Sequence, residues 1–184
     1  MVTKKASPMT ILKIDSSISG ENSVSRQLTR TIATALARGG EIVERDLAAQ
    51  PLSHLTERGQ DPHVLEEFLA ADTIVVGAPM YNFTVPSQLK AWLDRLAVAG
   101  KTFEYSAEGP KGLAGDKRVI VALASGGHYE DGNPFEHNKS YLKAFFNFIG
   151  IEPEFVEAKG VAMSPDAREA ALDAANTHIE TLAA

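Results

Sequence analysis

The sequence contains no cysteine, which excludes disulfides, thiolate nucleophiles and cysteine-ligated zinc or iron–sulfur centres. Its five histidines show no metal-ligand spacing, so we expect no metal site. No apolar run approaches the roughly 20 residues that cross a bilayer, and the lysines near the start have no apolar stretch behind them. These features predict a soluble cytoplasmic protein that does not act at a membrane.

Basic residues are also scarce, at 18 against 24 acidic residues, and the net charge is −6. Affinity for a phosphate backbone comes from clustered Lys and Arg, so this balance argues against nucleic acid as a partner. A small molecule or another protein is the expected partner. The length of 184 residues, 44% of them hydrophobic, fits one compact domain. We expect this domain over residues 10–184 and a flexible N-terminal extension over residues 1–9.

Short apolar runs alternate with longer amphipathic ones, which is typical of a βαβ architecture. The predicted strands are Thr10–Asp15, Glu41–Asp46, Thr73–Ala78, Arg118–Ala124 and Pro153–Ala158. The predicted helices cover residues 25–39, 63–72, 85–100, 140–150 and 164–184, with Pro86 and Ser164 at two of the helix starts. Runs such as TIVVGA are apolar at every position, as expected of strands covered on both faces. The pattern predicts an α/β three-layer sandwich around a five-stranded, parallel, doubly wound sheet.

Ligands in such sheets bind beyond the carboxyl ends of the strands, where the strand order reverses. We therefore expect the site in the loops after the first, third and fourth predicted strands. The first of these loops is DSSISGENSVS, residues 15–25. A helix N-terminus follows it and offers unpaired N–H groups, and the hydroxyls of Ser17, Ser23 and Ser25 add hydrogen-bond donors.

This loop contains no lysine, and Arg26 is the only cation nearby in the sequence, which suits a terminal phosphate monoester held mainly by neutral donors. The loop lacks both the G-x-G-x-x-G dinucleotide fingerprint and the triphosphate-binding G-x-x-x-x-G-K-[ST] pattern. The alternative is that Ser25 caps the helix and the other serines only fill the turn.

The second loop, residues 77–90, places Met80, Tyr81 and Phe83 where a polar turn is usual, together with the amide of Asn82. Such a set suits a flat heteroaromatic ring whose polar edge meets Asn82 and backbone amides. The alternative is that these residues cover the end of the sheet or form a subunit contact.

The third loop, residues 122–138, contains Ser125, Gly126 and Gly127, which allow a ligand to approach the backbone closely. His128 and Tyr129 follow and are placed to border a substrate pocket, although a lone loop histidine is often merely solvated. No G-x-S-x-G elbow supports a hydrolytic triad. We therefore expect no catalytic side chain and infer that a cofactor carries the reaction.

Several motifs together resemble one family. They are the serine loop ending in S-x-S, APMYNF followed by PSQLKAWLD, the hairpin-like FEYSAEGPKGL, the Gly-Gly pair of the third loop and FNFIGI. In this order and spacing the chain, from about Thr10 to its end, resembles the FMN-dependent NADH:quinone oxidoreductases or azoreductases of the acyl-carrier-protein-phosphodiesterase-like group. MYNF with the downstream PS-x-LK is the most specific part.

The resemblance implies a flavodoxin-like homodimer with one FMN per subunit near the dimer interface. NADH or NADPH would deliver hydride to flavin N5, and a quinone or azo compound would then take two electrons. By position, the phosphate would be held by Ser17, Ser23, Val24 and Ser25. The isoalloxazine ring would be lined by Met80, Tyr81, Asn82 and Phe83 on one side and by Ser125, Gly126 and Gly127 on the other. Tyr105 and Phe145 would border the substrate pocket.

The chain departs from the family pattern in two places. The segment DLAAQPLSHLTERGQDPHVLEEF between the second strand and second helix, residues 46–68, is shorter than in many members. The third loop reads Ala-Ser-Gly-Gly from Ala124 where the family often has Ser-Arg-Gly-Gly, which leaves the substrate and the nicotinamide preference open. Two other functions remain as alternatives: a flavodoxin-type FMN electron carrier between proteins, to which the acidic charge is suited, and a phosphate- or nucleotide-binding module without a redox role.

Overall fold

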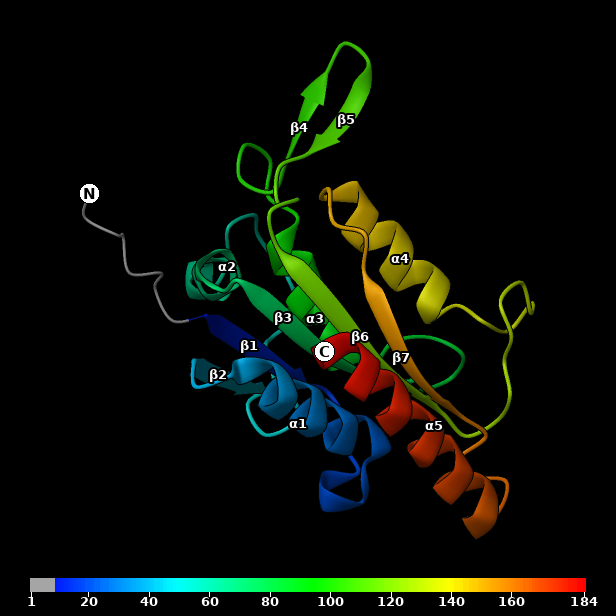
Figure 1. Cartoon of the computed structure of the whole chain (residues 1–184). Helices are drawn as coiled ribbons and strands as arrows, with labels where there is room; N and C mark the ends of the chain where they lie inside the picture. The colour runs from blue at the N-terminus through cyan, green and yellow to red at the C-terminus, as the bar shows by residue number, and fades with distance from the viewer. Residues whose placement is uncertain (1–8) are drawn as a thin grey trace.

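A computed structural model describes residues 9–184 and shows a sheet enclosed between two layers of helices (Figure 1). The predicted extension, residues 1–9, lies outside the described residues except for Met9. The central sheet has five strands in the order β2-β1-β3-β6-β7, and every pair in it is parallel. Its strands are β1 (Thr10–Asp15), β2 (Glu41–Asp46), β3 (Thr73–Pro79), β6 (Arg118–Ser125) and β7 (Glu154–Lys159). The predicted α/β doubly wound sheet is confirmed, and each predicted strand begins and ends within one residue of the observed one.

The described residues form five helices, each overlapping a predicted one; the first four connect strands, and the fifth follows β7. They are α1 (Val24–Ala37), α2 (Pro62–Ala70), α3 (Ser87–Leu96), α4 (Lys139–Phe148) and α5 (Pro165–Ala183), and a short 3-10 turn, η1 (Gly20–Asn22), precedes α1. The sequence signals at two starts act as predicted, because Pro86 is the N-cap of α3 and the Ser164 side chain accepts a hydrogen bond from the Ala167 N–H. Among the residues described, no helix is both long and apolar enough to cross a membrane.

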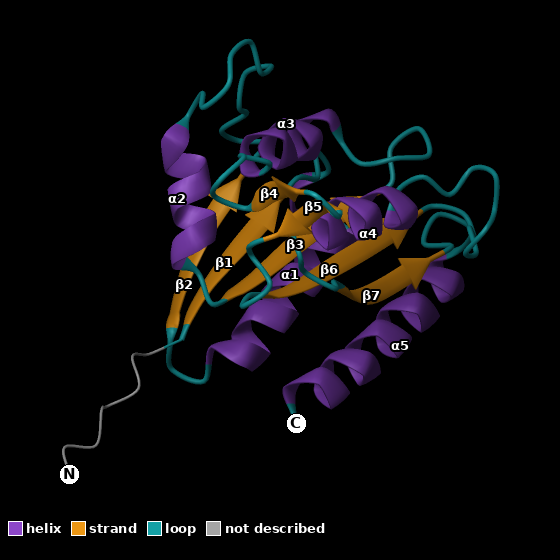
Figure 2. Ribbon diagram, turned by 90° about the horizontal axis from the view of Figure 1, so that it is seen from above, coloured by secondary structure: helices purple, strands orange, loops and turns teal. Residues whose placement is uncertain are grey.

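Helices α2, α3 and α4 cover one face of the sheet and α1 and α5 cover the other (Figure 2), and an apolar core lies under each layer. Under α2, α3 and α4 the largest fully buried side chains are Phe68, Trp92 and Phe146. Under α1 and α5 the core includes Leu28 and Ile179. Strand β3 is buried at every position, which explains why its sequence is apolar throughout instead of alternating.

A two-stranded antiparallel hairpin, β4 (Phe103–Ser106) and β5 (Gly109–Gly112), projects away from the sheet (Figure 1). Its base is anchored at the end of α4. The Phe103 and Phe148 rings lie 4.7 Å apart, and the backbones at Gly112 and Gly150 pack so closely that a β-carbon at Gly112 would overlap Gly150. Because the hairpin leads directly into the start of β6, it stands at the amino end of that strand.

The strand order reverses between β1 and β3, since their connections leave in opposite directions across the sheet. Loops at the carboxyl ends of these two strands therefore diverge and leave a crevice, the usual ligand site of a doubly wound sheet. The serine loop follows β1, the Met80–Phe83 loop follows β3, and the Ser125–Gly127 loop follows β6, the next strand.

Candidate functional site

A cavity of about 290 Å³ lies where the three predicted loops meet. Serine-loop residues form one wall, residues after β3 and β6 form the opposite walls, and the start of α5 contributes the remaining side. The lining residues of the prediction are Ser17, Ser23, Val24, Ser25, Met80, Tyr81, Ser125 and Gly126. The structure thus brings most of the predicted cofactor-binding residues to one cavity.

Direct hydrogen bonds fix the serine loop against the loop after β3. Ser16 Oγ donates to the Gly77 carbonyl at 2.6 Å, and the Ser17 and Tyr81 hydroxyls lie 3.1 Å apart. The Ile18 N–H also donates to the Tyr81 hydroxyl, at 3.1 Å. Ser16 and Ser17 are both buried, so these contacts hold the loop at a fixed distance from Tyr81.

The end of the serine loop presents the N-terminus of α1 to the cavity. Ser23, and not Ser25 as the alternative interpretation proposed, is the N-cap, because its hydroxyl accepts a hydrogen bond from the Arg26 N–H at 3.3 Å. Ser25 lies in the first turn with its hydroxyl 3.1 Å from that of Ser23. Within the described chain the N–H groups of Val24 and Ser25 donate to no acceptor, as expected of the first helical residues. These two N–H groups and two hydroxyls form an anion-binding arrangement.

Arg26, the cation nearest in sequence, is not free to neutralise an anion. Its guanidinium forms two 2.7 Å hydrogen bonds with the Asp46 carboxylate and also donates to the Ser17 carbonyl at 2.8 Å. Asp15 is a further carboxylate at 3.8 Å. The hydrogen bonds from Arg26, together with the N–H groups of Ala49 and Ala48, lower the pKa of Asp46 to about 2. Arg26 therefore fixes the serine loop and is already neutralised by carboxylates.

The cavity is lined by a cation, Arg168 on α5, that sequence reasoning did not find. Arg168 reaches the serine loop and donates from Nη2 to the Asn22 carbonyl at 2.9 Å. It lies 146 residues from Asn22 in the chain, so no local motif signals the contact.

The loop after β3 forms a tight turn with an unusual backbone. Tyr81 and Thr84 exchange N–H to carbonyl hydrogen bonds of 2.9 and 3.2 Å, while Asn82 and Phe83 between them have positive φ values of 48° and 72°. Positive φ at both central positions is typical of type I′ turns, in which glycine is common at the second position. A non-glycine residue there costs about 1–3 kcal/mol, and such strain is concentrated at functional sites. The turn holds the Asn82 side chain in solvent, and its amide makes no hydrogen bond with any described residue.

Aromatic rings gather at the rim beside this turn. The centroid of the Phe83 ring lies 5.0 Å from that of Phe135 and 6.2 Å from that of Tyr129. The His137 N–H donates to the Phe83 carbonyl at 3.0 Å, which ties the long loop after β6 to the turn. Phe83 and Phe135 both remain exposed. Phe135 was not predicted, because nothing in its local sequence distinguishes it from an ordinary loop residue.

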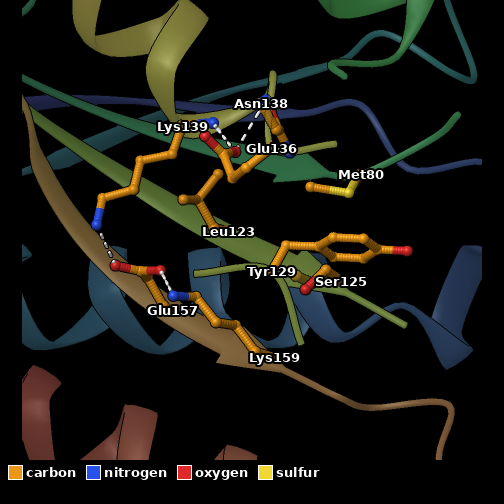
Figure 3. Close-up of a pocket in the computed structure, with 10 residues that line it drawn as sticks. Met80, Leu123, Ser125, Tyr129, Glu136, Asn138, Lys139, Glu157 and Lys159 are labelled. Atoms are coloured by element: carbon orange, nitrogen blue, oxygen red, sulfur yellow. Dashed lines mark hydrogen bonds and ion pairs between the residues drawn. The ribbon is translucent and has the colours of Figure 1, made fainter. Parts of the chain in front are cut away.

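A smaller hollow of about 20 Å³, next to Met80, Ser125 and Tyr129, has room for about one water molecule (Figure 3). Beneath it, the Glu157 carboxylate lies between the ammonium groups of Lys139, at 2.8 Å, and Lys159, at 2.9 Å. Burial raises the pKa of Glu157, but hydrogen bonds from the two lysines outweigh this effect and lower it overall. These ion pairs tie β7 to the start of α4 and support the floor of the site.

The remaining predicted residues have different positions. Gly127 and Tyr129 pack against each other at the mouth of the third loop, and exposed His128 lies against the backbone of Gly160. Tyr105 lies on the projecting hairpin with 77% of its surface exposed, and Phe145 lies near the end of α4, to which that hairpin is anchored. A single chain does not bring Tyr105 or Phe145 to the cavity. No three carboxylate or imidazole groups within residues 9–184 are placed to hold a metal ion.

The described residues fit FMN, the cofactor implied by the resemblance. The donors at the start of α1 suit a phosphate, while Met80, Tyr81 and the glycine loop offer apolar contacts and backbone groups to a flat ring. A second hollow, of about 600 Å³, shares Tyr81 with the first and is also lined by Ile18, Asn82 and Tyr141. Together the two spaces are in the range of pockets that hold ligands of this size.

Comparison with known proteins gives the same assignment. The model of a family described as having a flavodoxin-like fold matches residues 9–182. The FMN-dependent NADH:quinone oxidoreductase 2 of Bradyrhizobium diazoefficiens is 51% identical over 189 residues, which cover 89% of this chain and 94% of that protein. The FMN-dependent NADH:quinone oxidoreductase of a Bradyrhizobium species is 49% identical over 96% of this chain and the whole of that protein.

Among solved structures, an azoreductase from Bacillus anthracis superposes with a TM-score of 0.83 at 27% identity. The superposition covers 95% of this chain and 98% of that one. The family match over nearly the whole chain, and relatives of about half-identical sequence, agree with the resemblance carried by the three loops. The chain therefore belongs to the family of FMN-dependent NADH:quinone oxidoreductases, with the flavodoxin-like fold.

Proposed function

We propose that this protein is an FMN-dependent oxidoreductase that transfers two electrons from NADH to a quinone. The observation that carries the proposal is the cavity that joins the unpartnered N–H groups at the start of α1 to the strained turn after β3 and the glycine loop after β6. When bound, FMN would supply the redox centre, accepting hydride at N5 and passing two electrons to the acceptor. No acid–base side chain is needed for this chemistry.

The chain's own residues bind and orient the cofactor. Ser17, Ser23 and Ser25 and the N–H group of Val24 would hold the phosphate, since N–H and O–H donors at a helix N-terminus favour an anion. Met80, Tyr81, Asn82 and Phe83 would line one side of the ring, and Ser125, Gly126 and Gly127 the other. Preorganised donors at the ring's polar edge would stabilise negative charge on the reduced ring.

The aromatic residues at the rim of the cavity form the side of the site that would bind the electron acceptor. Exposed Phe83, Tyr129 and neighbouring His128 border an open face on which a planar quinone can lie. An aromatic azo compound has a similar flat shape, so we extend the proposal to azo cleavage. NADPH is included as an alternative reductant, because Ser125 stands where the family often has arginine and this departure leaves the nicotinamide preference open.

A homodimer is part of the proposal. Tyr105 and Phe145 lie near the hairpin and the end of α4, at the amino end of β6, so only a second copy can bring them to a site at the carboxyl ends. The outer faces of α3 and α4 offer a surface for it, since the hollow beside Asn82 is walled by Pro86 from the start of α3 and by half-buried Tyr141 from α4. Burial, with a smaller contribution from Asp94, raises the pKa of Tyr141 to about 12, so this side chain is uncharged at neutral pH.

We place the protein in the cytoplasm, with neither a membrane nor nucleic acid as a partner. The net charge of −6 supports the exclusion of nucleic acid.

Steady-state NADH oxidation by the FMN-loaded protein with a benzoquinone tests the proposal. We expect many turnovers per FMN and a rate that saturates with quinone. An electron carrier would bind FMN and show little turnover with NADH and quinone. A protein that remains colourless and takes up no FMN would instead support a phosphate- or nucleotide-binding module.

A further inference from the structure

Arg168 is held at the phosphate end of the cavity by the geometry of α5. Ser164 caps this helix, and the Arg168 N–H donates to the Ser164 carbonyl at 3.0 Å, which fixes the residue in the first turn. Its Nη2 donates to the Asn22 carbonyl at 2.9 Å, directly before the Ser23 cap of α1. Arg168 is partly buried and lines the same cavity as Ser23, Val24 and Ser25.

The other cations near this cavity are paired with carboxylates. Arg26 is bound by Asp46 and approached by Asp15, and Arg30 pairs with Glu21 at 3.5 Å in solvent. Lys13 lies between Asp15 and Glu44. Across the described chain, Arg168 forms no ion pair, and its one hydrogen bond leaves other guanidinium N–H groups available.

The charge of the ligand favours a nearby cation. A phosphate monoester carries about −1.5 to −2 at neutral pH, whereas a helix N-terminus contributes the equivalent of about +0.5. Neutral hydroxyl donors add no net charge. One unpaired guanidinium brings the balance close to neutral, and a charge-assisted hydrogen bond is roughly twice as strong as a neutral one.

We propose that Arg168 binds the phosphate of FMN and sets the preference of the site for FMN over riboflavin, which lacks the phosphate. This inference rests on the proposed function, because it assumes that the cavity holds a flavin. Arg168 acts here as a binding residue and takes no part in electron transfer.

The test compares Arg168→Gln with the wild type. Protein loaded with FMN, or separately with riboflavin, is diluted stepwise, and the released flavin is measured by its fluorescence to obtain each Kd. We expect Arg168→Gln to raise the Kd for FMN by about 10- to 100-fold, as for loss of a hydrogen bond to a charged group. The Kd for riboflavin should change by less than about twofold, and Arg168→Lys should recover part of the loss.

Lys101→Gln is the matched control for net charge, because Lys101 is exposed beside the distant hairpin and its side chain pairs with no described residue. It should leave both Kd values unchanged. The inference is overturned if Arg168→Gln leaves FMN affinity unchanged, or if it weakens FMN and riboflavin equally, as a structural role would.

If Arg168→Gln does not fold, the wild type alone supplies the test. Rising salt should weaken FMN binding and leave riboflavin binding unchanged, and a salt-independent FMN affinity would contradict the inference. If the wild type holds neither flavin, the proposed function fails, whereas wild-type binding with an unaffected variant removes only the role of Arg168.

Discussion

Substitutions in the turn after β3 should separate the effect of backbone strain on stability from the effect of a lost contact on FMN binding. Asn82 has φ at 48° and a side-chain amide with no partner in the described structure. Asparagine tolerates this left-handed conformation, glycine adopts it freely, and alanine is disfavoured there by about 1–2 kcal/mol. Asn82→Gly therefore removes the amide without strain, and Asn82→Ala removes the same amide and adds strain.

Two quantities distinguish the two effects. Asn82→Ala should lower the free energy of unfolding by about 1–2 kcal/mol relative to Asn82→Gly. Both variants should raise the Kd for FMN by about 2- to 12-fold, which corresponds to one neutral hydrogen bond of about 0.5–1.5 kcal/mol. Since both lose the same ligand contact, stabilisation by bound FMN cancels when the two variants are compared.

Urea unfolding followed by the fluorescence of Trp92, the sole tryptophan, measures stability, and flavin release measures affinity. If Asn82→Gly binds FMN as tightly as the wild type, the amide does not contact the cofactor. If the two variants are equally stable, the residue at this position does not have the left-handed backbone conformation.

Three further predictions concern the serine loop and the core. Replacing Ser17 or Ser25 with Ala should raise the Kd for FMN by about tenfold or more. The control Ser19→Ala, at an exposed serine, should leave the Kd unchanged. Equal Kd values for all three variants would show that the hydroxyls stabilise only the loop and do not bind FMN. Asp46→Asn should destabilise the fold by about 1 kcal/mol at pH 7, a value reduced for solvent screening because the side chain is 36% exposed. Because folding lowers the pKa of Asp46 from 3.8 to about 2, the stabilisation is present above about pH 4 and is lost as the pH falls toward 2. The urea midpoints of the wild type and Asp46→Asn should therefore converge near pH 2. A difference between them that persists at pH 2 would argue against the ion pair. Trp92→Phe should lose much less stability than the roughly 3–5 kcal/mol typical of truncation to Ala, because the buried Trp92 Nε1 has no acceptor among the described residues. Unfolding followed by circular dichroism measures both variants, and a loss as large as that of Trp92→Ala would refute this reasoning.

Local sequence was enough to predict the sheet. The inner strands β1, β3 and β6 are short, almost wholly buried runs between two helix layers, so composition alone marks them, whereas the edge strands β2 and β7 are less buried. The hairpin of β4 and β5 has one buried and three exposed residues in β4 and carries no such signal. It was indicated only by its resemblance to a family motif.

The parts of the site that lie in loops directly after strands were predicted from the sequence. The serine loop and the Met80–Phe83 turn meet because parallel strands place their carboxyl ends at one edge, which the order of elements already implies. Side-chain pairing could not be predicted in this way. In the sequence, Arg26 is the cation nearest to the serine loop, yet Asp46 from the neighbouring strand β2 neutralises it. The cation at the cavity is instead Arg168, from the last helix. Both facts depend on contacts between distant segments.

The central claim is that the cavity binds FMN and uses it to pass electrons from NADH to a quinone. The most direct measurement is the visible spectrum of the purified protein, recorded without oxygen after addition of FMN, then NADH, then one equivalent of a benzoquinone. The account predicts the bands of a protein-bound flavin that bleach with NADH and return with the quinone. A protein that retains no flavin, or whose flavin bands do not bleach with NADH, would contradict it.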